Sequence, residues 1–408
     1  MLVNHPLQSG KEAMGLLAPP FLSSVFFAVC GFKNGFTKKL FLSTLLLFIL
    51  QCLPFGEALT KVVEAAPKED FARYIHYAQN MIVNHTLWGG DQLHFKNEGL
   101  SYITQPGLRY VIALELLIFG KLYRFISILN ILLFTSCLFL LFKTIKEQIS
   151  NKTIQVLLFL LFVLSVPYAA KNILIGIPEW FTVSLLMASV YFYFSRNTKW
   201  LTIVLLALVP FMRQNILPAV LLLLVFYIMN QKNKWRYLVL FTFVLLLPVY
   251  HNLYYAGEFR FFTSMFKWPF LTYESWHSRV PTGFYPERIA NNAFHYLGFD
   301  WLRFHKPILI EEAFLFFWIF CFLFFYFGRL LQYRFLRLLY FATSLFLIII
   351  PQLFLATDYY PRFEFVNVYL VIIVFLFLYQ FKQNGMVRLP DFWKSLFTGK
   401  ARSLTHTH

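Results

Sequence analysis

Long apolar segments alternate with short polar segments along most of this sequence. A helix needs about 20 mainly apolar residues to cross the hydrocarbon core of a bilayer. The pattern therefore predicts an all-α integral membrane protein with about ten transmembrane helices. The apolar stretch at 16–32 is interrupted by Pro19 and Pro20, so we expect an interfacial leader there. The predicted spans are 40–59, 124–142, 154–170, 177–194, 201–212, 216–229, 237–250, 307–327, 336–356 and 363–381.

Composition supports this class. Of the 408 residues, 59% are hydrophobic and 13% are charged, whereas a soluble domain carries roughly 25% charged residues. This excludes a secreted disulfide scaffold, a disordered protein and an ordinary cytosolic enzyme. The four cysteines lie in apolar runs without metal-binding spacing, so we expect them to be packing residues. The net charge of +17 does not indicate nucleic-acid binding, because no soluble domain is present to carry a basic face.

Basic and acidic residues fall in different loops. Lys and Arg concentrate in short loops such as 143–152, 230–236 and 328–337, whereas most carboxylates lie in the loops between them. Because Lys and Arg favour cytoplasmic loops, both termini are predicted to be cytoplasmic. The predicted organisation is an N-terminal segment (1–39), a multispan domain (40–382) and a basic tail (383–408). The domain has two long outer loops, 60–123 and 251–306.

The first outer loop contains two helical patterns. Apolar residues recur at three- and four-residue spacing over 71–82, which predicts an amphipathic helix along the membrane surface. Asp70 stands immediately before it, either as a helix cap or as a base that accepts a proton from a hydroxyl; the two roles are compatible. A second, half-buried helix is predicted from Tyr110 to Phe119, closed by Gly120.

These features resemble the first outer loop of polyprenyl-phosphate-dependent glycosyltransferases of the GT-C fold. The likeness is closest to the branch of protein O-mannosyltransferases and aminoarabinose lipid A transferases, and it covers most of residues 40–381. In that family an Asp-Glu-x-Arg-Tyr run follows the first span, and Lys-Pro-Pro-Leu precedes a Tyr-Trp helix ending in Phe-Gly. The matching positions are Asp70–Tyr74, Ala78, Trp88, Gln105–Pro106, Tyr110, Phe119–Gly120, Arg124, Arg213, Asn252–Gly257 and Tyr359–Phe363.

The resemblance implies an outward-facing catalytic pocket in which Asp70 matches the catalytic aspartate and Tyr74 belongs to the substrate site. Two positions depart from the family's motifs, and the second of them concerns the binding of the donor. Phe71 replaces a second acid, and Gln105 replaces the lysine expected to meet the lipid phosphate. Arg109, Lys121 and Arg124 are candidates to replace that lysine.

The expected reaction is an inverting displacement of a polyprenyl phosphate by a lipid, glycan or protein acceptor, with Asp70 as base. Arg124 and Arg362 are the expected phosphate-side groups, and Arg213 is a further candidate, because arginine pairs well with phosphate. Arg124 could equally be a snorkelling anchor at a span end.

Several alternatives remain open from sequence. Asp91 and His94 could hold a divalent metal with Asp70, although two loop ligands do not define a site. Glu179 is either a helix-start acid or a substrate contact. The competing functions are a transporter or flippase, disfavoured because mid-span acids and internal repeats are scarce, and an envelope polysaccharide polymerase. The expected location is the bacterial inner membrane.

Overall fold

The computed structural model describes the chain in discontinuous ranges and divides it into two compact units, residues 1–184 (unit 1) and 185–408 (unit 2). The described ranges are 70–83, 106–120, 122–149, 151–175, 178–194, 198–213, 216–229, 231, 233–256, 273–274, 281–282, 312–354 and 362–386, with single residues between 22 and 50.

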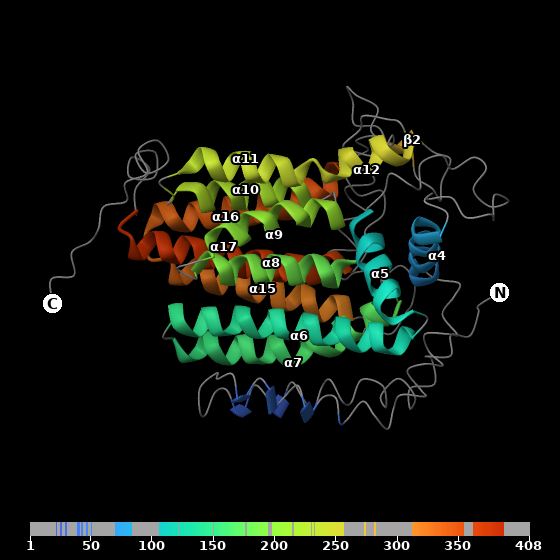
Figure 1. The fold of residues 1–408 in the computed structure, drawn as a ribbon. Helices are drawn as coiled ribbons and strands as arrows, with labels where there is room; N and C mark the ends of the chain where they lie inside the picture. The colour runs from blue at the N-terminus through green and yellow to red at the C-terminus, as the bar shows by residue number, and fades with distance from the viewer. Residues whose placement is uncertain are drawn as a thin grey trace. The chain divides into compact units, whose positions relative to one another are not determined.

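The described chain is almost entirely helical (Figure 1). Apart from short turns and connections, the exception among the described residues is an antiparallel pair of two-residue strands, β1 (Tyr273–Glu274) and β2 (Pro281–Thr282). Unit 1 contains α4 (Asp70–Val83), α5 (Pro106–Phe119), α6 (Tyr123–Gln148), α7 (Lys152–Ile175) and the start of α8 (Glu179–Phe194). Unit 2 contains the rest of α8, α9 (Lys199–Met212), α10 (Leu217–Met229), α11 (Lys234–Leu245), α12 (Leu247–Ala256), α15 (Glu312–Leu330), α16 (Arg334–Phe354) and α17 (Arg362–Gln383).

The predicted helical class is confirmed over the described residues, and each predicted span beyond residue 123 overlaps at least one helix. Two of these helices contain segments long and apolar enough to cross a membrane, Phe125–Gln148 in α6 and Phe365–Gln383 in α17. Shorter apolar segments occupy α9, α10 and part of α15. The number of spans, about ten, stays a prediction. Most of the first predicted span, 40–59, lies outside the described residues.

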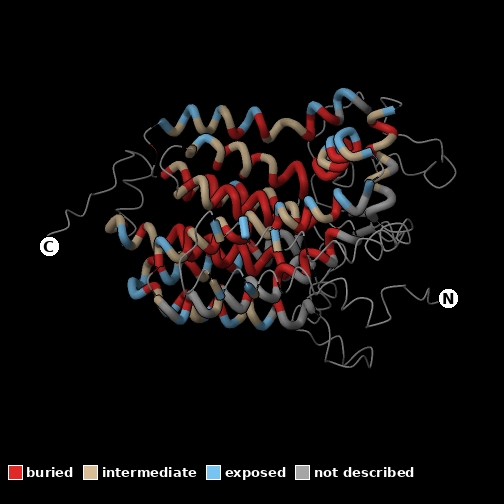
Figure 2. Tube along the Cα trace, turned by 60° about the horizontal axis from the view of Figure 1, so that its bottom comes forward, coloured by how far each residue is buried: buried red, intermediate tan, exposed pale blue. Residues whose placement is uncertain are grey.

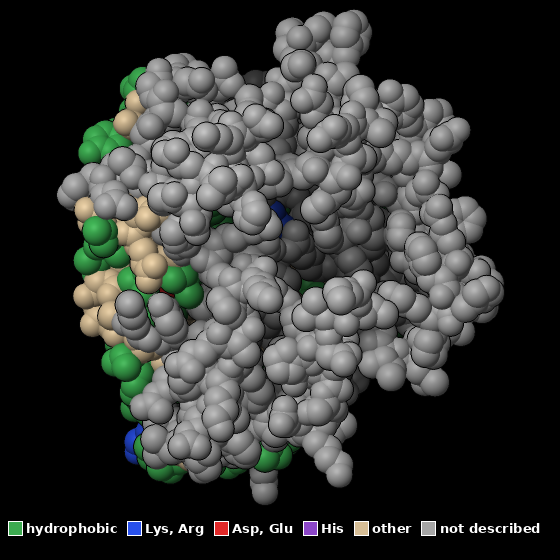
Figure 3. All heavy atoms as spheres, turned by 90° about the vertical axis from the view of Figure 1, so that its right-hand side faces the viewer, with side chains coloured by type: hydrophobic (Ala, Val, Ile, Leu, Met, Phe, Trp, Pro, Cys, Tyr) green, Lys and Arg blue, Asp and Glu red, His purple; other side chains and the backbone are tan. Residues whose placement is uncertain are grey.

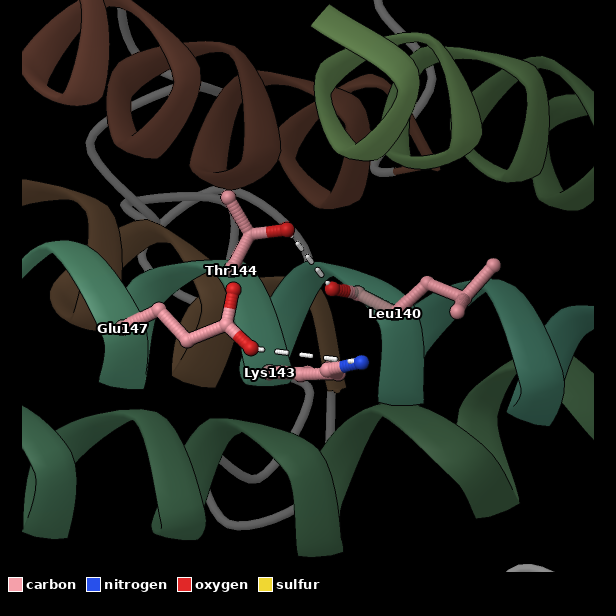
Figure 4. Close-up of polar contacts among 4 residues, drawn as sticks. All are labelled: Leu140, Lys143, Thr144 and Glu147. Atoms are coloured by element: carbon pink, nitrogen blue, oxygen red, sulfur yellow. Dashed lines mark hydrogen bonds and ion pairs between the residues drawn. The ribbon is translucent and has the colours of Figure 1, made fainter. Parts of the chain in front are cut away.

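Several polar side chains of α6 are bonded within the helix itself. The Thr144 hydroxyl donates to the carbonyl of Leu140 at 2.9 Å, and Lys143 lies 3.9 Å from Glu147 one turn later (Figure 4). Thr135 and Ser136 also donate to carbonyls four residues earlier. Such bonds satisfy hydroxyls without a partner from another helix, so α6 stays compatible with an apolar environment.

The two surface helices predicted in the first outer loop are present. The first, α4, begins at Asp70 itself, one residue earlier than its apolar pattern indicates. The second, α5, begins at Pro106, whose fixed φ and missing N–H suit a first helical position. It ends at Gly120, which has φ of 59° and donates its N–H to the Leu116 carbonyl at 2.8 Å.

The predicted span 237–250 is not one continuous helix. The helix breaks at Leu246, which separates α11 from α12. The cause is Pro248, because its nitrogen has no hydrogen to donate and its ring conflicts with the carbonyl four residues earlier. Helix α12 then continues to Ala256, so the first residues of the predicted second outer loop, which begins at 251, are helical.

The core of unit 2 is built around α17, which packs against both α15 and α16. Nearly every residue of α17 from Phe365 to Leu378 is buried. The Phe375 ring stacks on Phe327 of α15 with centroids 4.1 Å apart. Gly328 follows Phe327, and a side chain there would overlap the Phe341 ring of α16. In Figure 2 exposed positions lie mainly on the outward sides of the helices.

Candidate functional site

The structure distributes the predicted site residues between the two units. Asp70 is the first residue of α4 and Arg124 is the second residue of α6; both belong to unit 1 with Tyr74 and Arg109. In unit 2, Arg362 is the first residue of α17, and Arg213 follows the last residue of α9. For Asp70, Arg124 and Arg362 the structure describes the backbone only.

Within unit 1, α4 packs against α5, and this contact brings Tyr74 and Arg109 together. Helix α4 buries Ala78, Asn80 and Met81, while Val83 at its end is 73% exposed. Ala78 and Met81 belong to the apolar face that the pattern predicts, whereas Asn80 was expected on the polar side and is nevertheless buried. Asp70 therefore starts a helix whose buried face is held by α5.

Arg109 is the central cation of this contact. Its side chain is 2% exposed, and its guanidinium carbon lies 4.5 Å from the centroid of the Tyr77 ring. Burial lowers the pKa of Arg109, while Tyr74, Tyr77 and Tyr110 act in the opposite direction. Because an arginine remains protonated even when its pKa falls somewhat, α5 presents a positive charge beside α4. Such a charge is suited to binding an anion.

A second buried ionisable group, Glu115, lies further along α5. It is 5% exposed and hydrogen-bonds the side chain of Asn130 on α6, itself 5% exposed. Its other oxygen, Oε2, has no hydrogen-bond partner among the described residues. Burial raises the pKa of Glu115 to about 7, and the bond to Asn130 opposes this shift.

Sequence reasoning missed Glu115, Tyr77 and Asn130. The available signal for Glu115 was a lone acid inside the apolar stretch from Tyr110 to Phe119. An unsupported carboxylate on a buried helix face is costly, so such a residue is a candidate for a functional or hydrogen-bonded role. Asn130 carried no comparable signal, because its pairing depends on how α5 meets α6.

The outward side of α5 is apolar. Leu114, Leu117 and Ile118 are 58%, 66% and 64% exposed. In Figure 3, which views the side on which α4 lies in Figure 1, the described side chains that reach the surface are mainly hydrophobic. Helix α5 thus buries its charged side chains Arg109 and Glu115 and exposes Leu114, Leu117 and Ile118.

Arg213 occupies a different setting in unit 2. It caps the C-terminus of α9 in extended backbone conformation and is 6% exposed, with its N–H bonded to the Val209 carbonyl at 2.9 Å. A cation at this position is favoured by the helix dipole. The chain turns directly afterwards, since the N–H of Ile216 donates to the Arg213 carbonyl at 3.2 Å.

The remaining candidates from the sequence are Glu179, the possible metal ligands Asp91 and His94, and the cysteines. Glu179 is the first residue of α8 and is fully buried, consistent with a helix-start acid. Asp91 and His94 lie outside the described residues. The described residues include no group of three or more His, Cys, Asp or Glu that could hold a metal ion. Of the cysteines, Cys30, Cys137 and Cys321 are described and none forms a disulfide.

No known protein family, curated protein or solved structure matches this chain.

Proposed function

We propose that the protein is an integral membrane glycosyltransferase that moves a sugar from a polyprenyl-phosphate donor to a lipid, glycan or protein acceptor. The reaction is assigned to the outer face of a bacterial inner membrane. The observation that carries the proposal is the burial of the Arg109 cation against α4, the helix that starts at Asp70. A base and a phosphate-binding cation are the two groups this transfer needs.

The reaction proceeds by a single displacement at the anomeric carbon. The oxygen of the acceptor hydroxyl forms a bond to that carbon, and Asp70 accepts the proton of this hydroxyl at the same time. The bond between the carbon and the phosphate oxygen breaks, and the electron pair leaves with the lipid phosphate. Attack opposite the leaving group inverts the configuration, as in inverting glycosidases. The phosphate is already a good leaving group, so no general acid is required.

Arg109 is assigned to the departing phosphate. Negative charge grows on that group during bond breaking, and a pre-positioned cation in a low-dielectric site stabilises it strongly. The Tyr77 ring holds the guanidinium in place through a cation–π contact. Arg124 is a second phosphate candidate because it lies at the start of α6, close after Gly120 in the chain. Arg213 and Arg362 remain substrate-binding candidates in unit 2.

A second candidate function is proton-coupled transport. The observation that favours it is the buried Glu115 carboxyl, whose pKa near 7 suits a group that gains and loses a proton. In that case Glu115 would be essential and Asp70 would serve only as part of the α4 helix start.

The test is complementation of a gene deletion with wild type, Asp70→Asn or Glu69→Gln, followed by mass spectrometry of envelope lipids and glycans. The proposal expects wild type and Glu69→Gln to restore one sugar addition and Asp70→Asn to abolish it, at equal membrane abundance. Glu69→Gln is the matched control because it removes the adjacent acid. Full restoration by Asp70→Asn would contradict the proposal and favour transport.

A further inference from the structure

The basic residues of unit 2 gather at one end of its helices. Helices α9, α10 and α11 follow one another in alternating directions, so α9 and α11 begin where α10 ends (Figure 1). Helices α15 and α17 end, and α16 begins, at this same end of the unit. The Lys and Arg residues there are Lys199, Lys234, Arg236, Arg329, Arg334, Arg337 and Lys382.

Acidic residues do not balance this charge. The described acids of unit 2 are Glu274 in β1, Glu312 at the start of α15 and Glu364 at the start of α17. Since α15 and α17 end at the basic end, their first residues lie at the opposite one. The described residues at this end, which we call the basic end, therefore carry positive charge only.

Tryptophan accompanies lysine at the basic end. Helix α9 begins with Lys199–Trp200 and α11 with Lys234–Trp235, and these two helices pack against each other. Trp200 is 53% exposed and Trp235 is 79% exposed. Tryptophan is enriched where a membrane meets water, because its ring is apolar and its N–H needs a polar partner. Large exposed rings also occur at protein interfaces, so the choice of a membrane depends on the apolar surface that continues from Trp235.

An exposed apolar stripe runs away from Trp235 along α11. Val239 and Phe243 follow at four-residue spacing, 67% and 63% exposed. The stripe continues on α12 with Tyr250 and Tyr254, 46% and 74% exposed, and the Phe243 and Tyr250 rings lie 6.4 Å apart. At helical rise a straight helix from Trp235 to Tyr254 would extend about 28 Å, and the break at Leu246 makes this an upper limit. Exposed aromatic residues thus stand at both ends of an apolar stripe that covers much of the roughly 30 Å hydrocarbon thickness.

We propose that the basic end binds the phosphate groups of anionic phospholipids in the cytoplasmic leaflet, with Trp200 and Trp235 at headgroup level. The inference rests on the membrane integration proposed above and is independent of the sugar chemistry. Arg236 and Arg334 are exposed and carry the attraction. Arg337 instead bonds the Leu331 and Gln332 carbonyls, at 3.3 and 3.4 Å, and holds the turn before α16.

The test uses the full chain purified in a zwitterionic detergent. Its thermal stability and lipid retention in native mass spectrometry are measured with added phosphatidylglycerol, phosphatidylcholine or inorganic phosphate. We expect stabilisation and retention with phosphatidylglycerol only. The double variant Arg236→Gln/Arg334→Gln is expected to lose apparent affinity by about fivefold per charge removed. The matched control Arg236→Lys/Arg334→Lys keeps both charges and is expected to keep most of the affinity.

A second pair of variants tests the tryptophan. Trp235→Leu is expected to weaken phosphatidylglycerol retention, whereas Trp318→Leu is expected to have no effect. Trp318 is the control, because it is 54% exposed, as an exposed tryptophan must be for the comparison, but lies within α15, away from the basic end.

Three results would overturn the inference. They are equal stabilisation by phosphatidylcholine, an unchanged affinity in the double Gln variant, or stabilisation by inorganic phosphate alone, which would indicate a free anion site. Extraction of the protein from membranes by alkaline carbonate would instead refute membrane integration, and with it the proposed function. A protein that resists extraction and shows no lipid preference refutes this inference alone.

Discussion

At the scale of single residues, α5 buries two side chains of opposite charge whose surroundings differ. Arg109 lies against the tyrosines of α4, and Glu115 lies against an amide of α6. The two are six positions apart on one helix, so they point in different directions. We infer that they have separate roles, Arg109 toward an anion and Glu115 as a carboxyl whose burial raises its pKa to about 7, so that it can gain and lose a proton near neutral pH.

Arg109→Gln is expected to slow sugar transfer by about two orders of magnitude, the effect of losing one stabiliser of transition-state charge. Arg109→Lys is expected to give an intermediate rate, because it keeps the charge but loses bidentate geometry. Transfer rates in membranes, normalised to protein abundance, provide the measurement. Lys146→Gln, at a basic residue in the last turn of α6 that has no assigned part in the site, is the control. A wild-type rate for Arg109→Gln would show that the cation is not needed.

Glu115 predicts a defined pH dependence of stability. Its folded pKa of about 7 lies above that of an unfolded glutamate, so the folded state binds more protons between these values. The contribution of Glu115 to the free energy of unfolding should therefore be greatest below about pH 4.3. It should fall as the pH rises to about 7, by on the order of 3 kcal/mol. Glu115→Gln should lose this slope in thermal melts. Glu147→Gln, at an exposed acid of α6, should keep it; a slope retained by Glu115→Gln would contradict the assignment.

At the scale of elements, the helices of the first outer loop are explained by local signals. Three- and four-residue apolar spacing predicts α4, and Pro106 and Gly120 mark the two ends of α5. The break at Leu246 was missed although Pro248 signals it, because the apolar run continues across the proline. Glu115 and Asn130 could not be paired in advance, since their contact is set by packing between helices and not by spacing within one.

Gly120 provides a test of the α5 boundary. A side chain there meets no atom within 4 Å, so only its φ of 59° opposes substitution. Gly120→Ala is expected to destabilise unit 1 by about 1 kcal/mol, visible as a lower melting temperature. Gly120→Asn should be milder because asparagine tolerates left-handed backbone. Equal melting temperatures for the wild type and both variants would contradict this backbone assignment.

At the scale of the whole molecule, the distribution of charge predicts which parts face which side of the membrane. The first outer loop, with α4 and α5, is expected outside and the basic end of unit 2 inside. The prediction concerns topology, which the helices alone do not determine.

Cysteine labelling measures this topology directly. In a variant with the four native cysteines replaced by serine, Val83→Cys should react with a membrane-impermeant maleimide in intact cells. Asn233→Cys should react only after permeabilisation. Both positions are exposed, Val83 at the end of α4 and Asn233 before α11. Labelling of Asn233→Cys in intact cells would refute the proposed orientation.

The central claim is that Asp70 drives transfer of a sugar from polyprenyl phosphate. The most direct measurement is the amount of polyprenyl-phosphate-linked sugar in membranes that contain wild type, Asp70→Asn or Glu69→Gln. A blocked transfer leaves its donor unused, so one linked sugar should accumulate with Asp70→Asn while the corresponding envelope product disappears. Glu69→Gln should match wild type. A donor pool and envelope profile unchanged by Asp70→Asn would contradict the claim.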